Sequence, residues 1–475
     1  MNTACDTPVR GVPVALHNEE HDPSSYAAII KLALPMILST TGSTIMIFLD
    51  GIFLARYSEN AIAAVGPGGM ASWLFMSFLN GTAGYTSTFV AQYKGSGQGN
   101  RIGAIVWQGI YFALCSALIL AVFGSLFAHM IFAAVGHSAE LVPLEEAFFR
   151  ITCWGAPATV IGSAISGFYA GRGGMKTLMA VQMSGQAFNA VLAYALIFGR
   201  LGLPEWGIRG AAWASVIAQA LVTVTLMGIF FLPQYRQKYG TWSRRAFDWN
   251  LMLRLLRFGV PSGFRFFVEM FAWTGFVFFI GRLGELELAA TTIAWRINAI
   301  AFFPMIGLSI AVSTLVGQAQ GSGRPDWSAR CTWRAMGITQ VWMTLVACVL
   351  IFAPGPLVSL FQSADEMRAV QSADILGIVV VLLRYVAVYT LLDGFNVIFV
   401  GALQGAGDTR WTMIASVIMN MMFLLVLWGL DRFVPRLHAE WTAATIAVMV
   451  MALVWLWRFR AGQWRSMRVI EASPV

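Results

Sequence analysis

The chain has 475 residues, 58% of them hydrophobic and only 11% charged, with a formal net charge of +8. A soluble domain carries about a quarter charged residues, and a soluble chain of this length divides into domains joined by polar linkers. This composition excludes an ordinary soluble protein and indicates an integral membrane protein. The five Cys residues form no CxxC pair, so neither a disulfide framework nor a zinc site is expected.

Apolar stretches long enough to cross a bilayer recur along the whole chain. About 20 apolar residues suffice for one membrane-spanning helix. The sequence predicts an all-α integral membrane protein with twelve transmembrane helices, at residues 28–55, 63–91, 104–134, 145–170, 177–199, 211–232, 257–281, 287–317, 330–354, 375–402, 412–430 and 440–459. The polar first 26 residues contain no hydrophobic core of a cleavable secretory signal.

The basic residues predict the orientation, because Lys and Arg accumulate on the cytoplasmic side of membrane proteins. Most of them fall in segments that share one side if the N-terminus is inside, and six lie between spans six and seven: Arg236, Lys238, Arg244, Arg245, Arg254 and Arg257. We therefore expect both termini in the cytoplasm of a bacterial inner membrane. The positive charge is expected to face anionic lipid, and nucleic-acid binding is not expected.

The chain repeats itself at an offset of about 226 residues. Lys31-Leu-Ala-Leu-Pro35 aligns with Arg257-Phe-Gly-Val-Pro261, and Val90-Ala-Gln92 with Val316-Gly-Gln318. At the nearby offset of 234, Gly171 aligns with Gly405. The repeat predicts two pseudo-symmetric six-helix bundles with a substrate site between them near mid-bilayer. The expected organisation is a cytoplasmic tail (1–27), a first lobe (28–232), a cytoplasmic linker (233–256), a second lobe (257–460) and a cytoplasmic tail (461–475).

Three acids are predicted to lie well inside spans, where charge is costly and indicates function. They are Asp50 in span one, Glu269 in span seven and Asp393 in span ten. Their equivalents in the other half are not acidic, so two-fold packing alone does not explain them. Tyr389, Asp393 and Asn396 share one helical face and offer oxygens suited to a hard cation or a proton relay.

Each acid also has a structural interpretation. Asp393 could be a hydrogen-bonded structural acid, and Asp50 could be wetted at the outer end of its span. Glu269 could be neutralised by Arg265 one turn before it. Asn80, Gln186 and Asn189 could line a cavity or join helices by hydrogen bonds.

The ordered set of motifs resembles the multidrug and toxic compound extrusion family, from about Tyr26 to Trp457. The resemblance rests on five segments: Phe48-Leu-Asp50 after a Leu-Pro opening, Gln92-Tyr-Lys-Gly-Ser-Gly97, Gly259-Val-Pro261 with Glu269, Val316-Gly-Gln-Ala-Gln-Gly-Ser-Gly323, and Leu392-Asp393 with Gln404-Gly-Ala-Gly-Asp408. It implies two bundles around a V-shaped cavity and export of organic cations in exchange for Na⁺ or H⁺, with no cofactor.

Residue by residue, Glu269, Asp393 and Tyr389 resemble the coupling-cation site of the NorM-like branch, and Asn396 shares the face of Asp393. Glu269 and Asp393 would be metal ligands only if the coupling ion is Na⁺. Asp50 resembles the first-helix acid linked to proton or substrate binding, a group to which we assign Asn189 and Asn80 as well. The chain departs from another branch at Ala193, where that branch has an acid, which argues against a proton mechanism centred on the first lobe.

The sequence therefore favours an antiporter of organic cations that acts as a monomer by alternating access. A flippase or exporter of a lipid-linked or anionic metabolite is the alternative. That alternative requires clustered basic residues, which Arg150, Arg265, Arg296 and Arg384 do not obviously form. An enzyme is not expected, because the chain has no HExxH, no convincing Ser-His-Asp set and no GxGxxG tied to a strand.

Overall fold

The computed structural model describes residues 25–135, 140–357 and 373–471, and these residues are helical without strands. The expected N-terminal tail lies almost entirely outside the described residues. The helices are α1 (Tyr26–Tyr57), α2 (Glu59–Gly84), α3 (Thr86–Gly95), α4 (Ile102–Val135), α5 (Val142–Trp154), α6 (Ala156–Gly171), α7 (Met175–Phe198), α8 (Gly207–Phe230), α9 (Pro233–Tyr239), α10 (Trp249–Leu283), α11 (Glu285–Gly321), α12 (Pro325–Phe352), α14 (Ala373–Ala406), α15 (Thr409–Phe433) and α16 (Leu437–Ala461).

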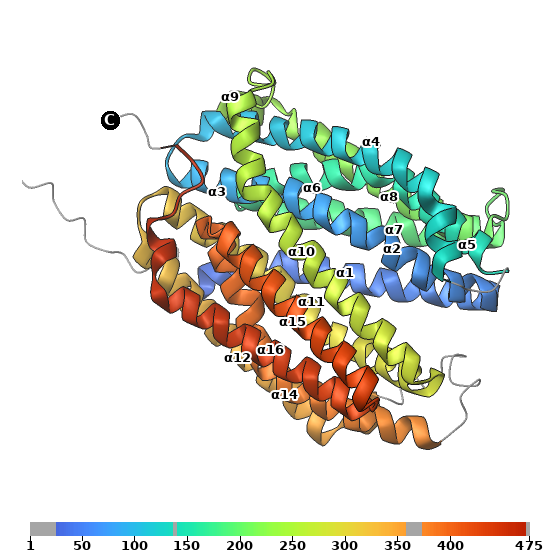
Figure 1. Cartoon of the computed structure of the whole chain (residues 1–475). Coiled ribbons are helices and arrows are strands. Elements are labelled where there is room, and N and C mark those ends of the chain that lie inside the picture. Colours follow the sequence, from blue (N-terminus) through green and yellow to red (C-terminus); the bar gives the residue numbers. More distant parts are fainter. Residues whose placement is uncertain (1–24, 136–139, 358–372, 472–475) are drawn as a thin grey trace, which may run out of the picture.

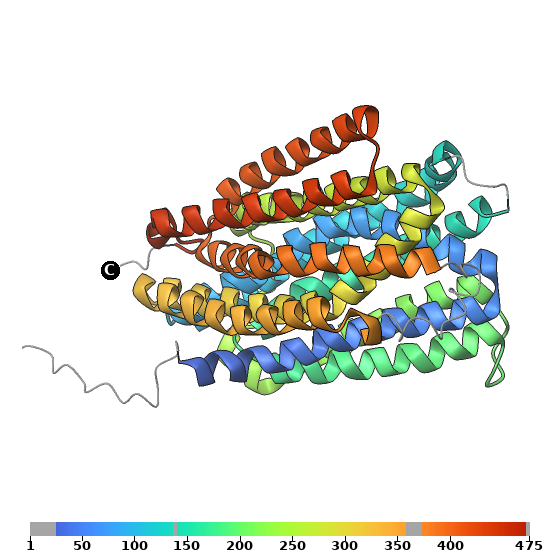
Figure 2. The same ribbon diagram turned by 90° about the horizontal axis from the view of Figure 1, so that it is seen from below.

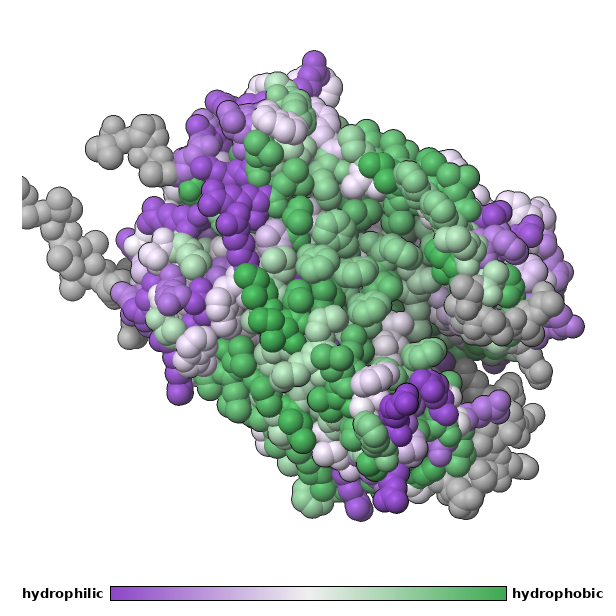
Figure 3. All heavy atoms as spheres, in the orientation of Figure 1, coloured by the Kyte–Doolittle hydropathy of each residue, from purple (hydrophilic) through white to green (hydrophobic). Residues whose placement is uncertain are grey.

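The prediction of twelve spans in two bundles is confirmed. Eleven helical stretches of the described chain are long and apolar enough to cross a membrane, with α2 and α3 counting as one. The twelfth is α5 with α6, bent by 44° at Gly155. Pro157 follows at the second position of α6, where its missing N–H costs no helical hydrogen bond. Figure 1 shows α1–α8 and α10–α16 as two bundles, and Figure 3 shows a broad apolar surface between two hydrophilic ends.

Several basic side chains lie at the end of the molecule where the described chain both begins and finishes. The described chain begins and finishes at one end, where α1 starts and α16 stops (Figures 1 and 2). We call this end the basic end, since Lys94, Arg172, Arg236, Lys238 and Arg460 lie at helix termini there. The opposite end carries the connections that follow α1, α7 and α15, and we call it the far end.

Helix α10 begins at Trp249 rather than near residue 257. The Asp248 side chain caps the helix by accepting a hydrogen bond from the N–H of Leu251 at 3.1 Å. Its first turns are amphipathic, burying Leu251 and Leu255 while Trp249 stays exposed. A search for apolar stretches therefore misses these turns.

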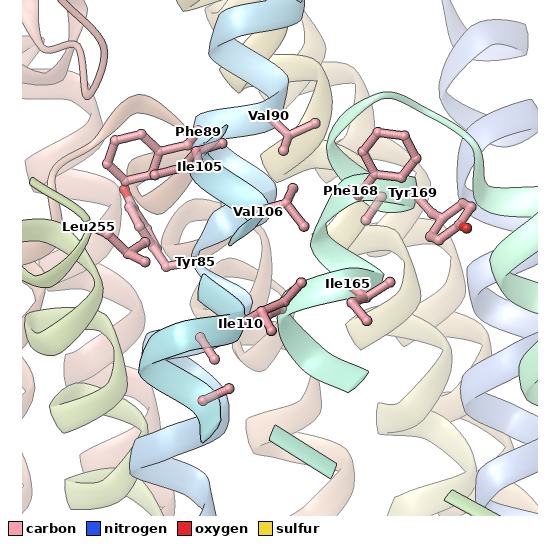
Figure 4. Close-up of a cluster of buried hydrophobic side chains, with 14 of the residues drawn as sticks. Tyr85, Phe89, Val90, Ile105, Val106, Ile110, Ile165, Phe168, Tyr169 and Leu255 are labelled. Atoms are coloured by element: carbon pink, nitrogen blue, oxygen red, sulfur yellow. The ribbon is translucent and has the colours of Figure 1, made fainter. Parts of the chain in front are cut away.

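The first helix of each half crosses from one bundle to the other. Leu255, early in α10, packs into the first-bundle cluster that contains Phe89 and Ile105 (Figure 4), whereas Phe276, later in α10, belongs to a core cluster of the second bundle. Helix α1 does the reverse, since Ile29 packs with α11 and α14 and Leu54 with α7 and α8. Pro35 and Pro261, which occupy equivalent repeat positions, lie inside these helices between the two contacts.

Glycines at equivalent repeat positions let the bundles meet closely. A methyl group placed on Gly81 of α2 would lie 2.7 Å from Cα of Gly263 in α10. One placed on Gly307 of α11 would lie 2.6 Å from the backbone nitrogen of Ile37 in α1. Residues 81 and 37 correspond to 307 and 263 at the 226-residue offset, so the two seams are related by the repeat. Small residues at such seams allow close backbone packing within a membrane.

A reciprocal contact joins the bundles at the basic end. The Gln92 amide donates to the carbonyl oxygens of Gly405 at 3.1 Å and Ala406 at 3.3 Å. The Gln318 amide donates to the carbonyl oxygen of Gly171 at 2.8 Å. In the repeat, Gln92 is equivalent to Gln318 and Gly171 is equivalent to Gly405. The glutamine of each bundle therefore donates to the equivalent glycine of the other bundle. The bundles are therefore joined at the basic end.

The last described residues reinforce this contact. Gln320 donates to the carbonyl oxygen of Trp464 at 2.7 Å in the second bundle. Further on, the N–H of Val469 donates to Oε1 of Gln92 at 2.8 Å, and Val469 and Ile470 are buried in the core cluster of the first bundle. The segment 462–471, which we call the C-terminal strap, therefore bridges the two bundles.

Candidate functional site

A cavity of about 1510 Å³ lies mainly within the second bundle and faces the first. Helices α10, α11, α14, α15 and α16 form most of its wall, and α1 and α2 contribute the rest. It reaches from Arg436 and His438, at the far-end connection of α15 and α16, to Gln404 in α14. There Tyr85 of the first bundle donates to the carbonyl oxygen of Gln404 at 2.8 Å. The cavity thus extends from the far end to the level where the bundles meet.

The cavity brings together the predicted coupling-cation residues. Glu269 from α10 and Tyr389, Asp393 and Asn396 from α14 all line it. The Asn396 amide donates to Oδ1 of Asp393 at 3.1 Å and to the carbonyl oxygen of Val448 at 3.2 Å, which fixes its orientation. Two carboxyl groups from different helices therefore share one site.

The neighbour of Glu269 on its own helix is Arg265. The Arg265 Nη1 lies 2.6 Å from Oε2 of Glu269, and both side chains line the cavity. The intrahelical pair anticipated from the spacing of four residues does form. Pairing and cavity lining coexist, so the structural interpretation of Glu269 does not remove it from the site.

Apolar side chains make up most of the remaining cavity wall. The aromatic residues are Trp73, Phe266, Trp273, Trp295, Phe302, Phe303, Phe423 and Trp455, with Met70, Met270, Met419, Met422 and Met451 among them. Trp73 of α2 meets Phe266 of α10 edge to face, with ring centroids 6.3 Å apart. Aromatic faces attract organic cations, and Met side chains adapt to ligands of different shape.

The first-bundle candidates are not among the residues that line this cavity. Asp50 in α1 and Asn189 in α7 each have a buried side-chain Oδ1 without a hydrogen-bond partner. Asn80 in α2 accepts a hydrogen bond from Ser163 at 2.7 Å and so joins α2 to α6. Gln186 donates to Ser43 at 2.6 Å and joins α7 to α1. The structure therefore separates these candidates from Glu269 and Asp393.

The site offers oxygen donors from four side chains, those of Glu269, Asp393, Tyr389 and Asn396. Among the described residues, no group of three or more His, Cys, Asp and Glu side chains could hold a metal ion. Na⁺ would instead draw on the two carboxylates, the Tyr389 hydroxyl and the Asn396 amide oxygen. Such oxygen donors fit a hard cation, and a proton would need only the carboxylates.

Sequence reasoning missed the contact at the basic end. The Gly-Ser-Gly segments after spans two and eight lie where α3 and α11 end, with Gly97 and Gly323 at φ of 76° and 74°. The repeat carried a further signal. In a two-fold symmetric interface, a contact made by one residue is repeated by its symmetry equivalent. Gln92 and Gln318 make such a pair of equivalent contacts.

The fold and the site together define a two-bundle membrane transporter. A family model described as MatE matches residues 35–195 and 261–428, and the chain belongs to this family. It is 29% identical over 442 residues to a probable multidrug resistance protein NorM of Burkholderia pseudomallei, covering 90% of this chain and 91% of the relative. A probable NorM of Thermotoga maritima is 23% identical over 467 residues, covering 96% and 97%.

Solved structures share the fold over nearly the whole chain. A MOP superfamily transporter from Pyrococcus furiosus superposes with a TM-score of 0.83 at 22% identity, covering 94% of this chain and 97% of that one. An outward-facing multidrug resistance MATE family transporter superposes with a TM-score of 0.82, also at 22% identity, with 94% and 97% covered. The predicted family and fold are confirmed.

Proposed function

We propose that this chain is a secondary active antiporter that exports organic cations or drugs in exchange for Na⁺ or H⁺. The observation that carries the proposal is one cavity in which an aromatic wall surrounds two carboxyl groups, those of Glu269 and Asp393. The wall suits lipophilic cations of varied shape, and the carboxylates suit the coupling ion. The curated relatives are named as multidrug resistance proteins, which supports the same substrate class.

Alternating access follows from the two-bundle geometry. With the bundles joined at the basic end, the cavity reaches the far end, so substrate leaves and the coupling ion enters there. When the bundles rock about the glycine seams, the basic end opens and the substrate enters from that side. The coupling ion must prefer one of the two conformations, because equal affinity for both shifts nothing. Its proposed site is Glu269, Asp393, Tyr389 and Asn396.

The proposed location is a bacterial inner membrane with the basic end and both termini in the cytoplasm, where Lys and Arg accumulate. One chain contains the whole cavity, so we propose that it works as a monomer among membrane lipids. Asp50, Asn189 and Asn80 are proposed as a second substrate or proton site in the first bundle. The buried Oδ1 atoms of Asp50 and Asn189, which lack hydrogen-bond partners, support that proposal.

The alternative substrate class, a lipid-linked or anionic metabolite, has less support. It requires basic side chains that converge on the cavity. Arg265 lines the cavity but is held by Glu269, and Arg436 lines it only at the far end, while Arg150 pairs with Glu146 instead.

Export of a fluorescent cation from proteoliposomes tests the proposal. Na⁺ and pH gradients are imposed separately, and ethidium movement is followed in each case. Uphill ethidium movement driven by one gradient is the expected result, and it identifies the coupling ion. If inserted protein moves no cationic dye under either gradient, the organic-cation assignment is wrong and anionic metabolites become the candidates.

A further inference from the structure

The Arg265–Glu269 pair places a permanent positive charge inside the site proposed for the coupling cation. The Arg265 side chain is 14% exposed and that of Glu269 is 29% exposed. Nη1 of Arg265 makes the contact with the carboxylate, whereas Nε is buried and has no hydrogen-bond partner. An arginine guanidinium stays charged at every physiological pH. The guanidinium therefore compensates the charge of Glu269 in this conformation.

We propose that Arg265 is a tethered competitor of the coupling cation for the carboxylate of Glu269. This inference rests on the proposed function. The guanidinium holds Glu269 when the coupling cation is absent, and the arriving cation displaces it. Arg265 is thus a residue that sets the affinity for the coupling cation, whichever ion that is.

The charges on the cavity wall give the exchange a consequence for the substrate. The titratable side chains that line the cavity are those of Glu269, Asp393, Tyr389 and Arg265 and, at the far end, Arg436 and His438. With Arg265 on Glu269, the ionised Asp393 leaves a net negative charge at the site, which attracts an organic cation. When the coupling cation takes Glu269, the released guanidinium faces the same cavity as an additional positive charge. Like charges repel, so binding of the organic cation is weakened in the conformation from which it leaves.

A purely structural pair would behave differently. Arg and Glu four residues apart stabilise many helices without any part in ligand binding. If that were the only role here, removing the guanidinium would change protein stability but not the concentration of coupling cation needed for export. The affinity for the coupling cation therefore distinguishes the two roles.

The experiment compares Arg265→Gln, Arg265→Lys and the native protein in proteoliposomes. Arg384→Gln is the matched control, because Arg384 is an intramembrane arginine of the same bundle that is exposed and does not line the cavity. For each protein, ethidium export is measured against the concentration of the ion that drives it. An opposite charge at this distance changes the affinity of a carboxylate for a cation by about tenfold or more. We therefore expect Arg265→Gln to lower the half-saturating concentration about tenfold, with Arg265→Lys and Arg384→Gln within twofold of native.

Equilibrium binding gives a second readout if the variant transports slowly. Binding of the driving ion to the purified protein is titrated without ethidium, and Arg265→Gln is expected to bind that ion about tenfold more tightly. Unchanged half-saturation and unchanged ion affinity in Arg265→Gln, beside a native protein that exports dye, would overturn the competitor role alone. A native protein that exports no dye under either gradient would overturn the proposed function and this inference with it.

Discussion

The carboxyl groups of Glu269 and Asp393 come from two helices, α10 and α14, and they share one cavity. Glu269→Gln and Asp393→Asn keep side-chain size and remove the negative charge. Each is expected to insert and fold normally but to lose gradient-driven dye export by at least about 100-fold, since a neutral amide cannot exchange one cation for another. Export assays beside circular dichroism of the purified variants check this. Native-like coupled export by both variants would refute the assignment of the site.

The pair Asp408–Arg458 is a structural counterpart within the same bundle. Nε of Arg458 donates to Oδ2 of Asp408 at 2.7 Å, and their side chains are only 7% and 3% exposed. Removing one partner of a buried ion pair leaves an uncompensated charge and costs about 3–5 kcal/mol. Asp408→Ala should lower the free energy of unfolding by about this amount.

The measurement for Asp408 is denaturant unfolding in detergent. The comparison is Arg465→Ala, which removes an exposed arginine whose contact with Asp326 is 3.3 Å long and solvent-accessible. Exposed pairs contribute about 0–1 kcal/mol, so this variant should unfold almost like the native protein. Equal losses in the two variants would contradict the role assigned to burial.

At the level of helices, α3 and α11 control whether the basic end can close. A methyl group on Gly95 would overlap the carbonyl oxygen of Gln318, and one on Gly321 would overlap that of Gln92. In Gly95→Ala and in Gly321→Ala, the conformation with a closed basic end should therefore fall from the main population to a minor one. Gly228→Ala is the control, because a methyl group at that position of α8 meets no atom within 4 Å.

Spin-label distances between Ser96→Cys and Ser322→Cys, at the ends of α3 and α11, report this closure once the native cysteines are replaced. The expected result is a longer distance in both overlapping variants and a native distance in the Gly228→Ala control. Native distances in all three variants would show that the glycines are not needed for closure.

Sequence reasoning succeeded where the signal lies within one helix. The apolar stretches predicted the spans, and the four-residue spacing predicted the pair of Arg265 and Glu269 that the structure contains. It failed at the first turns of α10, because amphipathic turns that pack on another bundle have no long apolar run. It also missed the reciprocal contacts of Gln92 and Gln318, which depend on how two bundles meet rather than on local pattern.

At the level of the whole molecule, the C-terminal strap adds an asymmetric contact to an otherwise two-fold junction. Val469 and Ile470 are buried in the first bundle, and Glu471 pairs with Arg254 at 3.0 Å. Burial of two aliphatic side chains contributes at least about 3 kcal/mol. Removing residues 467–475 should shift the protein toward the state in which the basic end is open, and the same spin-label pair should report a larger population at long distance. An unchanged distance distribution would show that the strap does not hold the bundles together.

Antiport is the central claim, and simultaneous measurement of both fluxes tests it most directly. Proteoliposomes are given an ethidium gradient but no ion gradient, and ethidium, Na⁺ and internal pH are followed together for the native protein and for Asp393→Asn. We expect ethidium moving down its gradient to drive Na⁺ or H⁺ in the opposite direction, and Asp393→Asn to abolish this coupled movement. Ethidium flux through the native protein without any opposed movement of Na⁺ or H⁺ would contradict it.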